Sequence, residues 1–389
     1  MYLFIALPAL LALLIAFPHL NSRGRQALGY GLFFITPILT ATGAIGVLTG
    51  FSGAGANSVL FGVSFYSVFV AYVFIRYREA SVLPRASFLV TALNPFYLST
   101  GPFPSRLMDA KAWPTLSEAV KRFLSSHREI LTGAFFALIL ANSLTHFFYL
   151  KSSGNVVDII VFGLAFELYV YFNFCGYSMI ARAFCRAIGM DVPTNFAHPF
   201  GASSVVEYWR RWHISLSAIL REIFFLPLKS KLGMFPAVFI VFLASAVWHG
   251  VSANFLLWGA FHAIFWCIAY RLHKTGFRVL NLFLLPFVVI IGRLIFAESD
   301  WTALGEKLSV VFDVTKWSVA NTIALPAGVR DKMNLALASA IVIAEVVIRG
   351  PSSEPRYGYL AKPAVQSLIA IYVCLMFAGL HGEPIYGNR

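Results

Sequence analysis

The chain has 389 residues, of which 59% are hydrophobic and only 12% are charged. Soluble proteins carry about 25% charged residues, so this composition excludes an ordinary soluble protein and indicates a polytopic membrane protein. The net charge of +13 gives no support for a nucleic-acid partner, because the basic residues lie in short loops between apolar runs, as the positive-inside rule requires. The four cysteines show no C-x-x-C spacing, so neither a disulfide framework nor a metal site is expected.

Apolar runs long enough to cross a bilayer recur along the whole chain. The first lacks the basic flank and the small-residue cleavage site of a removed signal, and we interpret it as a retained span. We therefore expect a single all-α membrane domain over 1–389 with about ten transmembrane helices. The expected spans are 2–19, 29–50, 57–75, 129–150, 156–185, 234–249, 254–271, 278–297, 333–348 and 364–380.

Three segments between these runs are not expected to cross the membrane. The apolar stretch 88–100 is too short and ends at Gly101-Pro102, which favours a re-entrant or interfacial segment. Residues 115–131 have the pattern of an amphipathic surface helix. Residues 298–332 mix acids and bases in nearly equal number, and we expect them to form the largest outward loop.

Loop charge predicts the orientation of the chain. The loops that carry clustered arginine and lysine, such as 76–128 and 182–231, should be cytoplasmic, and the neutral or balanced loops should be outside. Both termini are then outside. The segment 205–226 would enter from the cytoplasmic side and His249 would lie toward the outer end of its span, so this region would have access to both compartments.

Arginines, tryptophans and a histidine are concentrated in the stretch VVEYWRRWHISLSAILREIFFL at 205–226. At about 100° per residue it would form one helix with Trp209 and Trp212 on a broad apolar face. Glu207 stands one turn before Arg211, the favourable order for an ion pair. A narrow polar stripe would consist of Arg210, His213, Ser217 and Arg221.

Two interpretations of this stretch stay open on the pattern alone. It can be a basic amphipathic helix on the membrane surface, with its tryptophans in the interfacial belt. Alternatively, it lines a functional site, since ionisable groups among membrane spans are costly and usually functional. Glu167, near the middle of the span 156–185, has the same two interpretations: a protonated, hydrogen-bonded structural acid or a residue that lines the site.

Five motifs carry a resemblance to a known family. They cover the region 165–265, and Gly101-Pro102 is a weaker upstream match. This core region resembles the membrane-bound O-acyltransferase (MBOAT) family, in its bacterial cell-surface branch of alginate O-acetyltransferase and the teichoic-acid D-alanyl transfer protein. The motifs are YFNFCGYSMIA (171–181), PTNFAHPF (193–200), EYWRRWHISLS (207–217), VWHG (247–250) and LLWGAFH (256–262).

The resemblance implies an MBOAT-like fold in which His249 is the catalytic residue and His213 lies close to it in a tunnel across the membrane. The candidate donor- and substrate-binding residues are Arg210, Ser217, Arg221, Trp209, Trp212, Asn173, Tyr177 and Ser178. The chain departs from the family pattern at Asn173, where relatives usually have aspartate. It also has Lys229-Ser230-Lys231 where the alginate-type relatives have a Gly-Gly-Asn-Arg-like loop, so alginate itself is not assumed as the acceptor.

The chemistry of acyl transfer agrees with these residue types. Moving an acyl group, with acetyl as the first expectation, from a thioester to a hydroxyl needs a base near neutrality and donors for the oxyanion. Histidine titrates in that range, and no G-x-S-x-G elbow supports an acyl-serine enzyme. His249 would be the base, and His213 would orient the thioester or stabilise charge.

The expected donor is acetyl-CoA or an acyl-carrier thioester, with no bound cofactor. The expected acceptor is a cell-surface polysaccharide or an extracytoplasmic acyl-transfer partner, for which 298–332 would be a docking surface. The expected location is the bacterial cytoplasmic (inner) membrane, among its lipids. Two other functions stay open: a transporter or flippase for an acylated or glycan-linked lipid, and a non-catalytic scaffold for a polysaccharide synthase.

Overall fold

The structure is a computed structural model, and it describes most of the chain. The described residues are 12–41, 67–81, 83–92, 94, 101–104, 106–108, 113–152, 154–317, 329–348, 360 and 362–380. Within these ranges every regular element is helical and no strand occurs. The predicted all-α membrane class is therefore confirmed. That 1–389 forms a single domain stays a prediction.

The helices of the N-terminal half are η1 (Phe17–His19), α2 (Ser22–Ala41), an apolar helix Ser67–Arg76, α5 (Arg85–Ala92), α6 (Leu116–Ser125), α7 (His127–Ala134), π-helical η3 (Phe135–Ala141), α8 (Asn142–Leu144), η4 (Thr145–Ser152) and α9 (Val156–Ala187). Those that follow are η5 (Pro199–Gly201), α10 (Val205–Arg211), α11 (Ile214–Leu220), π-helical η6 (Arg221–Phe225), α12 (Leu226–Leu232), α13 (Met234–His249), α14 (Ala253–Lys274), α15 (Arg278–Ala297), α16 (Trp301–Phe312), η7 (Val314–Lys316), α17 (Val329–Ile348) and α18 (Pro363–Leu380).

Four stretches of the described residues are long and apolar enough to cross a membrane. They are His127–Lys151, Val156–Ala187, Ala253–Lys274 and Val279–Ala297, which agree with four of the predicted spans. Shorter apolar helices are Ser67–Arg76, Met234–His249 and Pro363–Leu375. The total of ten stays a prediction, because 1–11 and 42–66 lie outside the described residues.

Differences from the prediction occur at segment boundaries. The helix expected at 29–50 begins earlier, at Ser22, and is described as far as Ala41. In the stretch expected to be re-entrant, α5 ends at Ala92 and residues 95–100 are outside the described part. The surface helix expected at 115–131 is divided: a capping box of Thr115 and Glu118 begins α6, which buries none of its residues, and α7 begins after Ser126.

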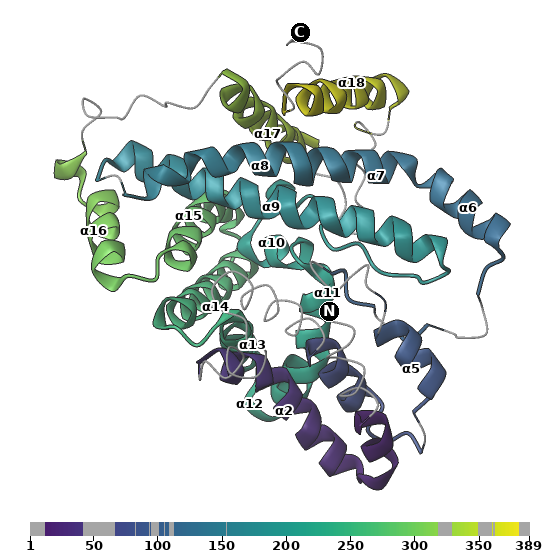
Figure 1. Cartoon of the computed structure of the whole chain (residues 1–389). Helices are drawn as coiled ribbons and strands as arrows, with labels where there is room; N and C mark the ends of the chain where they lie inside the picture. Colours follow the sequence, from purple (N-terminus) through teal and green to yellow (C-terminus); the bar gives the residue numbers. More distant parts are fainter. Residues whose placement is uncertain are drawn as a thin grey trace.

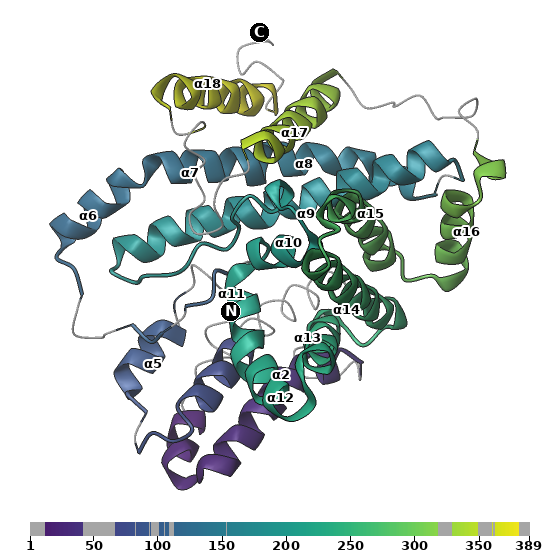
Figure 2. The same ribbon diagram turned by 180° about the vertical axis from the view of Figure 1, so that it is seen from behind.

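A long antiparallel pair of helices crosses the molecule: the line α7–η3–α8 runs beside α9 (Figures 1 and 2). The two backbones come closest at a pair of glycines. A Cβ on Gly133 would lie 2.6 Å from the carbonyl oxygen of Gly176, and one on Gly176 would lie 2.5 Å from the carbonyl oxygen of Gly133. Only glycine permits this approach, which small residues commonly provide where membrane helices cross. The crossing fixes α9, which carries the motif FNFCGYS, against its neighbour.

Other helices pack on both sides of this pair. In Figure 1, α17 and α18 lie on one side, and α10, α13, α14 and α15 lie on the other. The buried side chains form two main clusters, one around α9 and α15 and one around α2, Ser67–Arg76 and α11. Trp212 belongs to the first cluster and Leu216 to the second. The short segment between α10 and α11 therefore lies where the two clusters meet.

The first part of 298–332, the segment expected to be the largest outward loop, contains helix α16, and its outward position stays a prediction. Asp300 caps this helix through a hydrogen bond from the amide of Ala303 (3.0 Å), and Asp is a favoured N-cap residue. Lys307 on α16 donates a hydrogen bond of 2.5 Å to the buried carboxylate of Glu298, which ties α16 to the end of α15. Residues 318–328 lie outside the described part, and α17 begins at Val329.

Candidate functional site

The prediction of one continuous helix over 205–226 is wrong, because the helix is interrupted between α10 and α11. His213 adopts a left-handed backbone conformation, with φ of +45° and ψ of 53°, which is uncommon for a residue with a side chain. Two hydrogen bonds from a distant segment hold the break: Ala197 N–H donates to the Arg211 carbonyl (3.0 Å), and Ile214 N–H donates to the Asn195 carbonyl (2.9 Å). They replace helical bonds that the break removes. The motif PTNFAHPF therefore folds against the motif WRRWHIS.

The break also divides the predicted polar stripe. His213 is buried, Ser217 is partly buried, and Arg210 and Arg221 are exposed. The helix then widens into π-helical η6 from Arg221 to Phe225. The four side chains accordingly lie in different surroundings and do not form one face. The predicted ion pair between Glu207 and Arg211 is confirmed, at 2.5 Å.

His213 lies in a pocket of aromatic side chains. Its ring centroid is 6.4 Å from Phe103, 6.1 Å from Phe174, 6.2 Å from Phe196 and 6.3 Å from Trp248. Both ring nitrogens are buried and have no hydrogen-bond partner among the described residues. Buried polar atoms are almost always paired, so this imidazole is positioned to accept or donate a hydrogen bond to a bound molecule.

His249 is the last residue of α13, and its side chain is exposed. Its ring contacts Trp248 (4.7 Å between centroids), Phe255 (6.0 Å), Trp258 (5.6 Å) and Phe296 (5.0 Å). Since Trp248 also contacts His213, one indole touches both predicted catalytic histidines. The structure thus brings together two histidines that are 36 positions apart in the sequence, one buried and one accessible.

The two candidate tryptophans, Trp209 and Trp212, and one further histidine, His262, pack behind His213 and His249. Trp212 is buried against Phe196 (5.1 Å), and Trp209 lies edge-on to His262 (4.9 Å). His262 is buried and fits against Gly292 of α15, where a Cβ would lie 2.3 Å from the histidine Nε2. These contacts support packing roles for His262 and both tryptophans. Direct contact of the tryptophans with substrate stays a prediction.

The three candidate residues on α9 differ in exposure. Tyr177 is exposed, Asn173 is partly buried and Ser178 is buried. Ser178 accepts a hydrogen bond from Asn195 Nδ2 (3.0 Å), and Asn195 Oδ1 accepts one from Ser215 Oγ (2.8 Å). Sequence reasoning missed Asn195, although it lies within the quoted motif PTNFAHPF. Its amide links α9 to α11 directly behind His213.

The segment at Gly101-Pro102 lies against this linkage. Gly101 has a positive φ of +77°, and a Cβ at this position would lie 3.2 Å from Asn195 Nδ2 and 3.6 Å from Ser215 Oγ. Glycine permits both the conformation and the close approach. Phe103, two residues later, stacks on His213. The weak upstream match is therefore part of the site.

A second missed residue is Arg293, which lies within the apolar run of α15, near its C-terminal end. Its Nε donates a hydrogen bond of 2.5 Å to the buried carboxylate of Glu167, which also accepts a hydrogen bond from the Tyr208 hydroxyl (2.7 Å). Glu167 is therefore ion-paired and not an isolated acid. The signal was present in the sequence, since a lone arginine in an apolar run needs a partner as much as Glu167 does.

This ion pair also lies beside the histidines. The Arg293 guanidinium carbon is 5.5 Å from the ring centroid of Trp212 and 5.5 Å from that of Phe296. Phe296 in turn packs on His249. The pair thus joins α9, α10 and α15 and packs against Phe296, which contacts His249. Glu167 therefore has both a structural role and a place at the edge of the site.

The described residues contain no group of three or more His, Cys, Asp or Glu that could hold a metal ion. The polar groups assembled around the two histidines are hydroxyls, amides, and one guanidinium with its paired carboxylate. This set is suited to proton transfer and to hydrogen bonding of a bound substrate.

Comparison with known proteins agrees with the resemblance. Residues 130–297 match the model of the MBOAT, membrane-bound O-acyltransferase family. The chain is 29% identical over 212 residues to the probable alginate O-acetylase AlgI of Pseudomonas syringae pv. tomato, covering 52% of this chain and 40% of that protein. It is 31% identical over 140 residues to the peptidoglycan O-acetyltransferase of Helicobacter pylori, covering 34% and 27% of the two chains.

A third relative is the teichoic acid D-alanyltransferase of Bacillus subtilis, 25% identical over 171 residues, covering 40% of this chain and 43% of that protein. The chain spans less than half the length of each of these relatives. The matched region contains both histidines, Asn195 and the Glu167–Arg293 pair. Residues 130–297 of this multi-pass membrane protein are a domain of the membrane-bound O-acyltransferase family.

Proposed function

We propose that this protein is a membrane O-acyltransferase that moves an acyl group, acetyl in the first instance, from a thioester donor to a hydroxyl of a cell-surface polysaccharide. The observation that carries the proposal is the pair of histidines joined by Trp248 inside the matched domain. One imidazole is exposed and the other is buried with both nitrogens free among the described residues. The exposed imidazole can exchange a proton with a substrate hydroxyl, and the buried imidazole can hold a bound substrate in place by a hydrogen bond.

In the proposed reaction, His249 is the general base. One imidazole nitrogen accepts the proton of the acceptor hydroxyl while the hydroxyl oxygen attacks the carbonyl carbon of the thioester. The C–S bond then breaks, and the leaving thiolate accepts this proton from the imidazolium. An ester and a free thiol then leave the site. General acid–base catalysis of this kind contributes roughly 10²–10⁴ in rate.

His213 would act on the carbonyl of the thioester. Its free ring nitrogens lie in a largely apolar pocket, where a hydrogen bond to a developing oxyanion is stronger than it would be in water. Asn195 and Ser215 hold the backbone that carries the ring. We assign His213 the role of orienting the donor and stabilising charge.

The donor, acceptor and location follow from the same proposal. The donor is acetyl-CoA or an acyl-carrier thioester from the cytoplasm, and the acceptor is a polysaccharide or an extracytoplasmic acyl-transfer partner. The relatives named alginate O-acetylase, peptidoglycan O-acetyltransferase and teichoic acid D-alanyltransferase support an envelope polymer as the acceptor class. A bacterial inner-membrane location follows from such an acceptor.

The test compares His249→Gln with His273→Gln in purified membranes. His273 lies in the last turn of α14 and is exposed, so its substitution controls for the loss of a histidine. We expect His249→Gln to lower acyl transfer by about 10²–10⁴ without a change in protein level, and His273→Gln to leave it unchanged. Near-normal transfer by His249→Gln would overturn the proposal, as would equal losses in both variants.

A further inference from the structure

A cavity of about 330 Å³ lies where the last turns of α9 meet α6. Three arginines line it: Arg122 of α6 and Arg182 and Arg186 of α9. The turn 189–192 that follows α9 forms the rest of the wall. This arginine pocket lies outside the histidine site, and the proposed reaction does not use its side chains.

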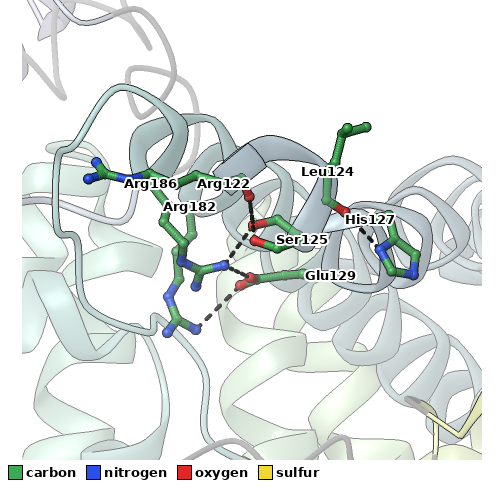
Figure 3. A network of polar contacts seen from close by, with 8 residues as sticks. Arg122, Leu124, Ser125, His127, Glu129, Arg182 and Arg186 are labelled. Atoms are coloured by element: carbon green, nitrogen blue, oxygen red, sulfur yellow. Dashed lines mark hydrogen bonds and ion pairs between the residues drawn. The ribbon is translucent and has the colours of Figure 1, made fainter. Parts of the chain in front are cut away.

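The pocket holds more positive than negative charge. Glu129 lies between two of the guanidinium groups, with Arg182 at 3.3 Å and Arg186 at 2.9 Å (Figure 3). The third arginine, Arg122, has no such acid in the pocket. Among the described residues the acid that lines the pocket itself is Asp191, which is 85% exposed and lies 3.8 Å from Arg106. Three arginines therefore line the pocket, and the closely paired carboxylate of Glu129 contacts two of them.

Such a pocket is suited to phosphate. The guanidinium group presents a planar fork of donors that matches phosphate oxygens in pairs. The side chains of Arg182 and Arg186 are only 32% and 40% exposed, so they are partly removed from water before any anion arrives. The volume lies within the range of pockets for small molecules.

The pocket is on the membrane side from which a cytoplasmic donor would approach. Helix α9 has 32 residues, which is about 48 Å at 1.5 Å per residue, whereas the hydrocarbon core is about 30 Å thick. Arg182 and Arg186 lie in its last two turns and begin the basic loop that the positive-inside rule makes cytoplasmic. A water-soluble anion can therefore reach them.

The pocket is also joined to the histidine site along two walls. On α9, Ser178 precedes Arg182 by one turn. On the other wall, the turn 189–192 leads within three residues to Asn195. Asn195 donates a hydrogen bond to Ser178 (3.0 Å), and its backbone carbonyl holds Ile214 next to His213. An anion in the pocket is thus held by the two segments that also support the buried histidine.

We propose that the arginine pocket binds a phosphate group of the acyl donor, a coenzyme A thioester, and so places its thioester toward His213. This proposal rests on the proposed acyl transfer, because it assigns the site that retains the donor. It also commits to a nucleotide donor over a carrier protein, since the pocket has the size of a small-molecule site.

The experiment measures binding of coenzyme A to the full-length protein in nanodiscs of zwitterionic lipid. Arg122→Gln removes a positive charge from the pocket and leaves both ion pairs of Glu129 intact. Arg128→Gln is the matched control, because Arg128 is exposed on the adjacent helix α7 and does not line the pocket. Glu129→Gln removes the negative charge and is the opposite perturbation. Inorganic phosphate and vesicles of anionic phospholipid serve as the alternative probes.

We expect Arg122→Gln to weaken coenzyme A binding about tenfold, within the range for one lost charge-assisted hydrogen bond. Arg128→Gln should change it less than twofold, and Glu129→Gln should tighten it. Equal effects of Arg122→Gln and Arg128→Gln would overturn the proposal. It would also be overturned if coenzyme A did not bind, or if only inorganic phosphate or anionic vesicles responded to Arg122→Gln.

The two proposals fail in distinguishable ways. Pocket-dependent coenzyme A binding in a protein that transfers no acyl group would leave the donor site standing and remove the proposed reaction. Acyl transfer from coenzyme A with an unchanged KM in Arg122→Gln would leave the reaction standing and remove the donor site.

Discussion

The buried pair of Glu167 and Arg293 provides the strongest test of the structure. Both side chains are at most 9% exposed and lie 2.5 Å apart on helices α9 and α15. Removing one partner of a buried ion pair leaves the other charge uncompensated, at a cost of about 3–5 kcal/mol, whereas replacing both partners can be nearly neutral. Glu167 keeps one further hydrogen bond, from Tyr208, so we take the lower end of the range, about 3 kcal/mol.

The perturbation is a double-mutant cycle of Glu167→Gln, Arg293→Met and the double variant. We expect each single variant to lower the free energy of unfolding by about 3 kcal/mol, more than a hundredfold in the unfolding equilibrium. The double variant should lose clearly less than the sum of the two, with a coupling energy of at least about 1 kcal/mol. Unfolding in mixed detergent micelles, followed by circular dichroism, measures all three.

The chain offers a matched control in Arg76 and Glu222. This pair is nearly as close, at 2.7 Å, but its side chains are 44% and 36% exposed. Exposed pairs contribute about 0–1 kcal/mol, so Glu222→Gln should cost less than about 1 kcal/mol. The reasoning is refuted if Glu167→Gln costs no more than Glu222→Gln, or if the single losses in the buried pair simply add.

Two further predictions concern packing and pH. In Gly292→Ala the new methyl group would lie 2.3 Å from His262 Nε2, so we expect a loss of about 1–3 kcal/mol in the free energy of unfolding, largely restored by His262→Ala in the same chain. Burial alone would raise the pKa of the Glu298 carboxyl, but the hydrogen bonds from Lys307 and from the Asp300 amide, together with the positive charges of Lys307 and Lys151, hold the pKa below its usual range. A carboxyl whose pKa is lower in the folded state than in the unfolded state stabilises the protein at pH above the unfolded-state pKa. This stabilisation is lost as the pH falls through the folded-state pKa. Acid titration of thermal stability should therefore show a smaller loss below about pH 4.5 in Glu298→Gln than in the parent chain, and identical curves would contradict the assignment.

Composition and hydropathy were sufficient to predict the class of the fold. The spans at 156–185 and 254–271 are predominantly apolar over more than 17 residues, and a single apolar segment in a bilayer satisfies all its backbone hydrogen bonds internally as a helix. The predicted boundary of α2 was less accurate, because Ser22 to Gly29 are mostly polar or small and carry no apolar pattern, although they are helical. Hydropathy locates the membrane, and it does not locate the ends of helices that extend beyond it.

The geometry around His213 could not be predicted from periodicity. The pattern of 205–226 fits one amphipathic helix, and the break at His213 depends on bonds to Asn195 and Ala197, which lie far outside any helical window. The motif resemblance located the histidines, but it did not indicate that the amide of Asn195 connects α9 to α11. Long-range partners of this kind become visible only when the chain is folded.

The pairing of Glu167 with Arg293 is a similar case with a different lesson. Each residue alone was visible as a charge in an apolar run, and the costs of burying them are so high that a mutual partner was a reasonable expectation. Only one of the two was considered, since Arg293 lies outside the quoted motifs. An inventory of every isolated intramembrane charge would have suggested the pair.

The left-handed backbone at His213 affects how substitutions at this position should be interpreted. Asparagine adopts this conformation more readily than other residues with a side chain, whereas β-branched residues adopt it poorly. A change to valine would therefore disturb the chain path between α10 and α11 and remove the imidazole at the same time, but a change to asparagine would mainly remove the imidazole. Two requirements would therefore limit natural variation at this site: the residue must adopt the left-handed conformation, and its side chain must supply the chemistry of the imidazole. An asparagine at 213 in a related sequence would then mark a protein that has kept the scaffold and lost the imidazole.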